Sequence, residues 1–278
     1  MPTTSTQRTY RYLRVAISGT VAVIFIAVLV TIPRVGLLPS LSHYYYTPAR
    51  MLFVGALITV SVCFFALSGS GAERVLLDAA AMLAPLLAIV PTAISADSVP
   101  GITVTCPGAC VPDAVDAEVD VGLATYLIVG VLVLAVAVTL ALTGEVDRRG
   151  ALLSSAIAVV VLAGVAAWWW IAPVAFRQWA HLITAAGFFG LIAAVAVVTA
   201  FWPSDRRPPP RGLKASYVVV AIAIVVDVAA MPVFGNVRVG DVYGIFVGEV
   251  LALLLFVTFW ILQTVQYWRA DAGEIPLR

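Results

Sequence analysis

Residues 121–143 read VGLATYLIVGVLVLAVAVTLALT, a stretch without any charged side chain. About 20 apolar residues in an α-helix cross the ~30 Å hydrocarbon core of a bilayer. The rest of the chain has the same character, because 62% of its 278 residues are hydrophobic and only 11% are charged. A soluble protein has about 25% charged residues. The composition therefore excludes a soluble enzyme, a nucleic-acid-binding protein and a disordered protein, and it makes the lipid bilayer the principal partner.

Eight stretches of this length and character occur along the chain, each bounded by charges, prolines or glycine-rich turns. Lipid offers no partner for an open strand edge, so each stretch is predicted to be a helix. We expect an all-α fold, a bundle of eight transmembrane helices that forms one domain over residues 1–278. The predicted spans are residues 13–32, 51–69, 75–95, 121–143, 151–172, 181–202, 217–235 and 242–266. Pro85 and Pro91 make the third span the least regular.

The basic residues predict the orientation of the bundle. With the N-terminus inside, the cytoplasmic segments hold twelve of the 16 basic residues and the outer segments hold four, namely Arg34, Arg50, Arg177 and Arg238. Both termini are then cytoplasmic. The first apolar run is too long for a signal peptide and is interpreted as a retained helix. Because arginine outnumbers lysine fifteen to one, we expect a GC-rich bacterial source and a multi-pass protein of the plasma (inner) membrane.

Two loops have a distinct composition. Residues 203–216 are basic and proline-rich, which predicts an extended cytoplasmic connector. This loop either holds the flanking spans in place or binds anionic lipid headgroups. The outer loop at 96–120 is acidic and carries Cys106 and Cys110 around a Pro-Gly turn. A Cys106–Cys110 disulfide is the leading interpretation, and a zinc site with His43 and His181 is the weaker alternative.

Two acids fall deep in the predicted spans, where charge is costly. Asp227 is expected about 12 Å below the outer surface and Glu249 about 10 Å below it, on consecutive antiparallel helices. Pro232 frees a backbone carbonyl one turn beyond Asp227, and glycines at 240, 244 and 248 permit close helix packing beside Glu249. Matched depth beside a freed carbonyl is typical of cation or proton handling.

We expect these acids to share an outward-facing polar crevice with Arg50, which opens the second span, and His181, which opens the sixth. The alternative is a buried polar network that only locks the helices together, with Glu249 paired to Arg50. Two further residues are secondary candidates. His43 is interpreted as an interfacial residue, and Asp78 as the partner of Arg74 four residues earlier on one helix face.

The stretch SLSHYYYTPAR at 40–50, which continues into FVGAL at 53–57, resembles a signature of uncharacterised bacterial multi-pass membrane proteins. Those chains carry an S-x-S-x-Y-Y-Y-T-x-x-R segment before an F-V-G-x-L helix. They also have a histidine that opens a later helix and a glutamate in the final span, which match His181 and Glu249. The resemblance implies that Arg50, His181 and Glu249 belong together, and it implies no activity.

The leading functional hypothesis is the binding or permeation of a small cation, a proton or a lipid-like solute through the crevice. The alternatives are an intramembrane lipid hydrolase, in which His181 and an acid activate water, and an accessory subunit of a membrane complex. The chain has no Walker A, H-E-x-x-H or G-x-S-x-G motif, and its single lysine, Lys214, lies in a predicted loop. We therefore expect no cofactor and no resident metal, and the sequence carries no signal for an oligomeric state.

Overall fold

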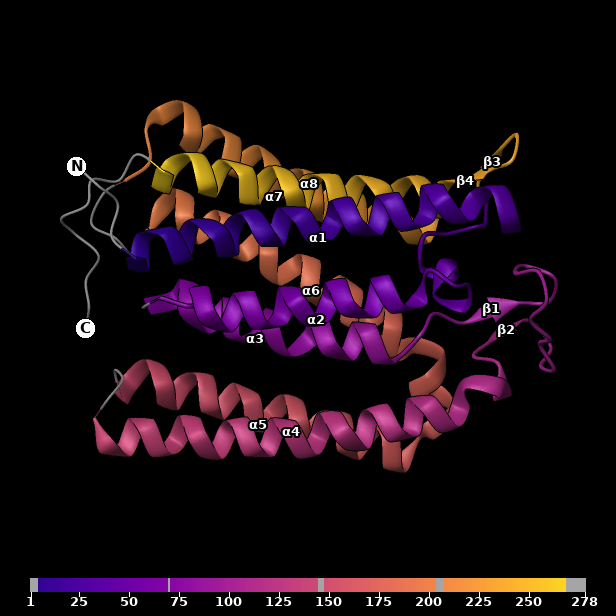
Figure 1. Cartoon of the computed structure of the whole chain (residues 1–278), viewed down its shortest axis with the longest axis horizontal. Coiled ribbons are helices and arrows are strands. Elements are labelled where there is room, and N and C mark those ends of the chain that lie inside the picture. The colour runs from indigo at the N-terminus through magenta and orange to yellow at the C-terminus, as the bar shows by residue number, and fades with distance from the viewer. Residues whose placement is uncertain (1–4, 70, 145–147, 204–207, 269–278) are drawn as a thin grey trace.

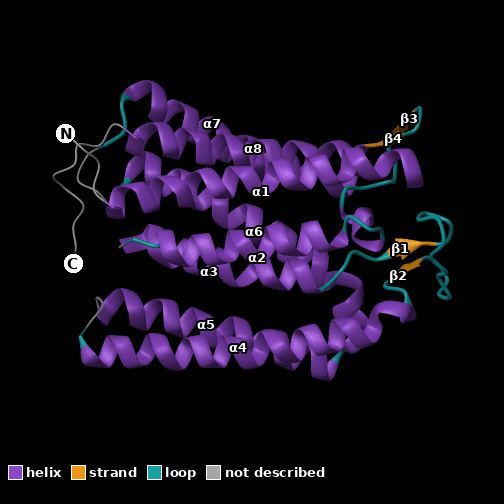
Figure 2. Ribbon diagram, in the orientation of Figure 1, coloured by secondary structure: helices purple, strands orange, loops and turns teal. Residues whose placement is uncertain are grey.

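The computed structural model describes residues 5–69, 71–144, 148–203 and 208–268. Within these ranges the fold is all-α, with two short two-stranded ribbons (Figures 1 and 2). The helices are α1 (Ser5–Val35), α2 (Arg50–Leu67), α3 (Gly71–Ile89), α4 (Asp116–Thr143), α5 (Arg148–Ile171), α6 (Pro173–Phe201), α7 (Arg211–Phe234) and α8 (Gly244–Trp268). The antiparallel strand pairs are β1 (Ile94–Ser95) with β2 (Ala109–Cys110), and β3 (Arg238–Val239) with β4 (Val242–Tyr243).

Seven of these helices are long and apolar enough to cross a membrane, so the chain is a polytopic membrane protein. The helix outside this group is α3, which carries Glu73, Arg74 and Asp78 in its first two turns. Its apolar part is instead rich in alanine, and Ala80, Ala81 and Ala84 are wholly buried. The small side chains let α3 pack closely against α2, α5 and α6. Protein rather than lipid therefore surrounds α3.

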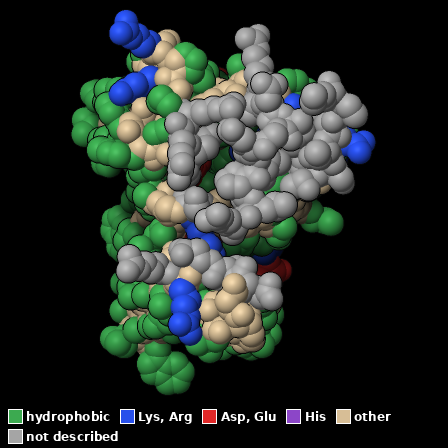
Figure 3. Space-filling model, turned by 90° about the vertical axis from the view of Figure 1, so that its left-hand side faces the viewer, with side chains coloured by type: hydrophobic (Ala, Val, Ile, Leu, Met, Phe, Trp, Pro, Cys, Tyr) green, Lys and Arg blue, Asp and Glu red, His purple; other side chains and the backbone are tan. Residues whose placement is uncertain are grey.

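The helices run alternately up and down, so their connections gather at two ends (Figure 1). We name as the strand end the one that holds both ribbons and the loop that joins α1 to α2. The start of α1 and the end of α8 lie together at the opposite, terminal end, where Arg11 donates to the Trp268 carbonyl (2.6 Å). Figure 3 views this terminal end and shows Lys and Arg side chains distributed over it.

An aromatic cluster fills the middle of the bundle. Phe64 of α2 stacks on Phe188 of α6 and on Trp260 of α8, with ring centroids 6.0 and 5.3 Å apart. Phe256 of α8 packs against the same two phenylalanines. These rings are almost fully buried, and they form part of the main hydrophobic core.

The helix boundaries differ from the predicted spans in two places that matter for the site. α6 begins at Pro173, so the prediction that His181 opens this helix is wrong: His181 lies more than two turns inside it. A proline is favoured in the first turn because its missing N–H has no helical partner there. α7 begins at Arg211, so residues 211–216 of the predicted connector are helical. Residues 204–207 of that connector lie outside the described ranges.

Candidate functional site

The loop between α1 and α2 is folded by its own hydroxyl groups. Its centre is a 3₁₀ turn, η1 (Ser42–Tyr46). The fully buried Tyr44 donates its hydroxyl to the Gly36 carbonyl (3.0 Å) and accepts from the Leu38 N–H (3.2 Å). Tyr46 donates to the Thr92 carbonyl beyond α3 (2.6 Å). These bonds hold Ser42 of the loop beside His181 of α6 and Glu249 of α8.

Glu249 of α8 receives its hydrogen bonds from this loop. The Ser42 hydroxyl lies 2.6 Å from Oε1, and the Ser42 N–H donates to Oε2 at 3.3 Å. The Leu41 backbone and the Ser40 side chain also hydrogen-bond to this carboxyl group. The start of a short helical turn therefore caps Glu249 with several donors, an arrangement that suits a negative charge.

His181 of α6 reaches the same serine from the other side. Its Nε2 lies 3.1 Å from the Ser42 hydroxyl oxygen, and its Nδ1 lies 2.8 Å from the Val90 carbonyl. A carbonyl oxygen can only accept, so Nδ1 carries a proton and Nε2 is the variable nitrogen. Ser42 therefore bridges Glu249 and His181, and we call these three residues the relay cluster. All three side chains are partly buried.

His43 lies beside the relay cluster in the same turn. Its Nδ1 is 2.6 Å from the Ser40 hydroxyl, which also accepts from the His43 N–H (3.2 Å). Burial, with a smaller contribution from nearby His181, lowers the pKa of His43 to about 4. His43 is therefore neutral at physiological pH. Its lowered pKa follows mainly from burial, which disfavours the charged form of the imidazole.

Arg50 does not join the relay cluster, so it neither shares a crevice with Glu249, as expected, nor pairs with it, as the alternative had it. The Arg50 guanidinium forms a salt bridge with Glu118 of α4. It also donates to the Tyr45 hydroxyl (2.8 Å) and lies 4.4 Å from the Tyr45 ring centre. Arg50 does open α2, as predicted. Its position lets it hold the start of α4 against the loop.

Two other acids of the predicted outer loop form salt bridges with a second arginine. Arg177 of α6 contacts Asp116 (3.5 Å) and Asp120 (3.1 Å), and Asp120 also accepts from the Trp169 indole (3.2 Å). The sequence placed these acids in a loop, whereas residues 116–120 form the first turn of α4. Acidic side chains are favourable at that position because the N-terminal end of a helix is positive.

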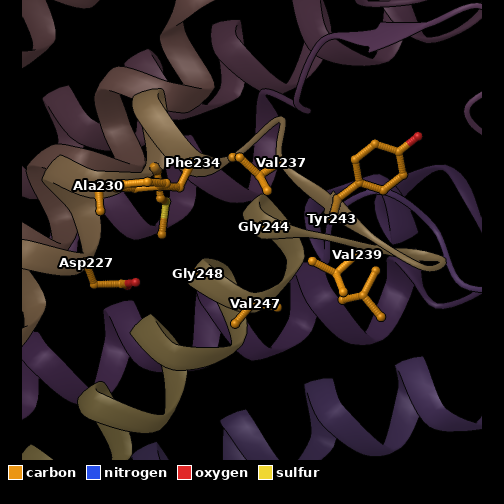
Figure 4. A pocket seen from close by; sticks show the side chains of 12 residues that line it. Asp227, Ala230, Phe234, Val237, Val239, Tyr243, Gly244, Val247 and Gly248 are labelled. Carbon is orange, nitrogen blue, oxygen red and sulfur yellow. The ribbon is translucent and has the colours of Figure 1, made fainter.

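Asp227 lies apart from the relay cluster in a pocket of its own. The pocket is an open hollow with a volume of ≈ 320 Å³, lined by residues of α7, α8 and the β3–β4 ribbon. Figure 4 shows the Asp227 carboxylate pointing from α7 toward Gly248 of α8. The four predicted crevice residues thus divide into three places: His181 with Glu249, Arg50 with Glu118, and Asp227 alone.

The remaining predicted residues have structural partners. Asp78 lies 3.7 Å from the Arg74 guanidinium and accepts from the Ser154 hydroxyl (2.7 Å). Cys106 and Cys110 are joined in a disulfide, with Cα atoms 6.4 Å apart, so their thiols cannot serve as zinc ligands. In the described ranges, no group of three His, Cys, Asp or Glu side chains is placed to hold a metal ion.

Ser42 is the residue that sequence reasoning missed. It stands within the S-x-S pattern quoted above, but serines are common in loops, and its two partners follow it by 139 and 207 residues. The signal was the repeated hydroxyl pattern S-x-S-x-Y-Y-Y-T beside a span boundary. No protein-family model matches this chain, and no curated protein or solved structure is similar to it at a significant level.

Proposed function

We propose that this membrane protein binds and transfers protons at the relay cluster, as part of the permeation of a proton or a small cation. The observation that supports it is that the Ser42 hydroxyl contacts both the Glu249 carboxyl group and the His181 imidazole, at 2.6 and 3.1 Å. In the membrane frame, the strand end faces outward and both termini are cytoplasmic. All eight helices span the inner membrane of a bacterium.

The number of hydrogen atoms in these contacts requires a bound proton. Each of the two contacts needs one hydrogen, and the Ser42 hydroxyl supplies only one. The second is carried by Glu249 as a carboxylic acid or by His181 on Nε2. In the first state Glu249 donates to Ser42 and Ser42 donates to neutral His181. In the second, His181 donates to Ser42 and Ser42 donates to the carboxylate.

Exchange between these two states moves one proton from α8 to α6. The Glu249 O–H bond breaks as a new O–H bond forms on Ser42, while the original Ser42 proton passes to Nε2 of His181. Atoms and charge balance, since a neutral acid and a neutral imidazole become a carboxylate and an imidazolium. A cluster that lacks the proton leaves two acceptors facing each other at one contact, which is unfavourable in a poorly solvated site.

Proton flux into proteoliposomes tests the proposal. Purified protein is reconstituted with a pH-sensitive dye inside the vesicles, and a potassium gradient with valinomycin imposes a membrane potential. We expect flux above that of protein-free vesicles, its loss in Glu249→Gln, and a reduction of at least tenfold in Ser42→Ala. Ser42→Thr retains the hydroxyl and should restore the flux.

Asp78→Asn is the matched control, because it removes a carboxylate from another helix and preserves its shape. Its flux should equal that of the original protein. If Ser42→Ala and Glu249→Gln fold, insert and pass protons at the unaltered rate, the proposal is wrong. The absence of any flux above protein-free vesicles would overturn it equally.

A second candidate function, an intramembrane lipid hydrolase, is favoured by the contact between Ser42 and His181. A serine hydroxyl 3.1 Å from an imidazole whose other nitrogen is fixed by the Val90 carbonyl resembles a nucleophile with its general base. A fluorophosphonate probe distinguishes the two functions. If Ser42 is a nucleophile, the probe will label the original protein and leave Ser42→Ala unlabelled. If Ser42 only relays protons, the probe will label neither protein.

The basic connector is proposed to bind anionic lipid headgroups at the cytoplasmic surface. Arg211 and Lys214 lie in the first turn of α7, and the Lys214 ammonium lies 4.2 Å from the centre of the Phe201 ring. Each basic group near an anionic surface adds about 1 kcal/mol to membrane attraction. We also propose that this chain is related to the uncharacterised bacterial membrane proteins that residues 40–57 resemble.

A further inference from the structure

The pocket around Asp227 has a composition unlike that of the relay cluster. Its walls are almost entirely apolar and include Met231 and Phe234 of α7 and Val239 and Tyr243 of the β3–β4 ribbon (Figure 4). Asp227 is the single acidic or basic side chain among the lining residues. A volume of ≈ 320 Å³ lies within the range of pockets that hold small organic ligands.

Glycines on α8 create part of the space. A Cβ atom at Gly248 would lie 3.1 Å from Met231 Cε and 3.6 Å from Asp227 Oδ1. Any side chain there would intrude between α8 and the carboxylate. Gly240 in the turn between β3 and β4 has a φ of +61°, which lets the ribbon fold back beside the helix ends. Gly248 therefore leaves space for the pocket, and Gly244, where a Cβ would meet the Phe234 carbonyl oxygen, lets the start of α8 lie close to the end of α7.

The Asp227 carboxylate lacks a complementary group. Its Oδ2 atom is buried and has no hydrogen-bond partner among the described residues. Arg238, the basic residue of the ribbon, is engaged at the tip, where it donates to Asp241 (2.9 Å) and to the Gly240 carbonyl (2.7 Å). An unpaired carboxylate beside apolar walls is unfavourable until a donor with positive charge approaches it.

The mouth of the pocket lies beside the lipid-facing surface. Two of its lining residues, Phe234 of α7 and Val247 of α8, are more than half exposed in the isolated chain, and exposed apolar residues on a membrane helix face the acyl chains. A ligand that enters here comes from the bilayer and brings an apolar body. The carboxylate then selects a donor with positive charge.

We infer that this pocket binds a lipid-soluble primary amine, with the apolar body against Met231 and Phe234 and the ammonium group on Asp227. Two sources carry this chemistry, a free alkylamine and the ethanolamine headgroup of a phospholipid. A quaternary ammonium such as choline has no N–H to donate, and so it cannot satisfy Oδ2 in the same way. This inference is independent of the relay cluster.

Equilibrium binding of radiolabelled dodecylamine to the protein in phosphatidylcholine nanodiscs tests the inference. We expect saturable binding of one amine per chain above the level of empty nanodiscs. Asp227→Asn should weaken it at least tenfold, while Asp227→Glu, which retains the charge, should bind. Gly248→Ala should weaken binding with the carboxylate still in place. Labelled dodecanol, which has the same chain without the charge, should show no effect of Asp227→Asn.

Two comparisons complete the experiment. Asp78→Asn, a carboxylate change remote from the pocket, should bind the amine like the original protein. Phosphatidylethanolamine added to the nanodiscs should compete if the headgroup is the natural occupant, and it should leave binding unchanged if a free amine is. Non-saturable binding overturns the inference, as does equal affinity in folded Asp227→Asn or an equal loss in Asp78→Asn.

Discussion

Among single residues, His43 has the clearest effect on how the stability of the fold depends on pH. Because its pKa is lowered to about 4 from an ordinary value of 6.5, the unfolded chain takes up a proton between those values while the folded protein does not. Stability is therefore unaffected above pH 6.5 and declines as the pH falls toward 4. The full loss amounts to at most about 3 kcal/mol. Thermal unfolding in detergent from pH 7.5 to 4.5 measures this decline.

His43→Asn isolates the contribution of this imidazole. Its side-chain amide can take the place of Nδ1 opposite the Ser40 hydroxyl, with its NH₂ group as donor or its oxygen as acceptor, so the hydrogen bond survives and the titrating group is lost. We expect the variant to lose less stability than the original protein over the same interval. Parallel unfolding curves for the two proteins would show that His43 does not cause the decline.

Among the elements of the fold, the position of the segment at 40–47 was predictable from the sequence, but its hydrogen bonds were not. Its position between the first two predicted spans follows from the apolar runs. The sequence placed Arg50 with Glu249 and His181, whereas in the structure Ser42 of this segment contacts Glu249 and His181. The internal structure of the segment does not follow from the sequence, because each hydroxyl has a particular distant partner. Tyr44 bonds to Gly36 and Leu38, while Tyr46 bonds to Thr92. The sequence position of a hydroxyl group does not identify its acceptor. These hydrogen bonds can therefore be assigned only from the three-dimensional positions of the backbone.

The helices themselves were largely predictable, since the apolar runs give the approximate centres of the seven helices that are long and apolar enough to cross a membrane. Helix ends were less predictable because helices continue past the hydrocarbon. Pro173 starts α6 well before the apolar run, and this shift placed His181 deeper than expected. The crevice prediction grouped four ionisable residues by depth alone. Depth constrains position along the bundle axis and leaves the rotation of each helix open, which is why Arg50 faces Glu118 and Asp227 faces a separate pocket.

For the whole molecule, the number of spans depends on α3. The start of α1 and the end of α8 lie together, with Arg11 4.7 Å from the Trp268 ring and Arg14 4.4 Å from the Tyr267 ring. An even number of crossings places both ends on one side, whereas a chain with seven crossings has its ends on opposite sides. The charged first turns of α3 are compatible with a span because Asp78 is held by Arg74 and Ser154 inside the protein.

Cysteine labelling on either side of α3 tests this count. Gly69 and Ala96 are exposed positions that flank the helix, and no atom lies within 4 Å of the place where a side chain at Gly69 would begin. In intact cells or oriented vesicles, we expect a membrane-impermeant thiol reagent to label Ala96→Cys from outside. Gly69→Cys should react only after the membrane is permeabilised. The original protein gives the background, since Cys63 is buried and Cys106 and Cys110 are paired. Labelling of both positions from one side would mean that α3 does not cross, and that the alternation of all eight helices across the bilayer is wrong.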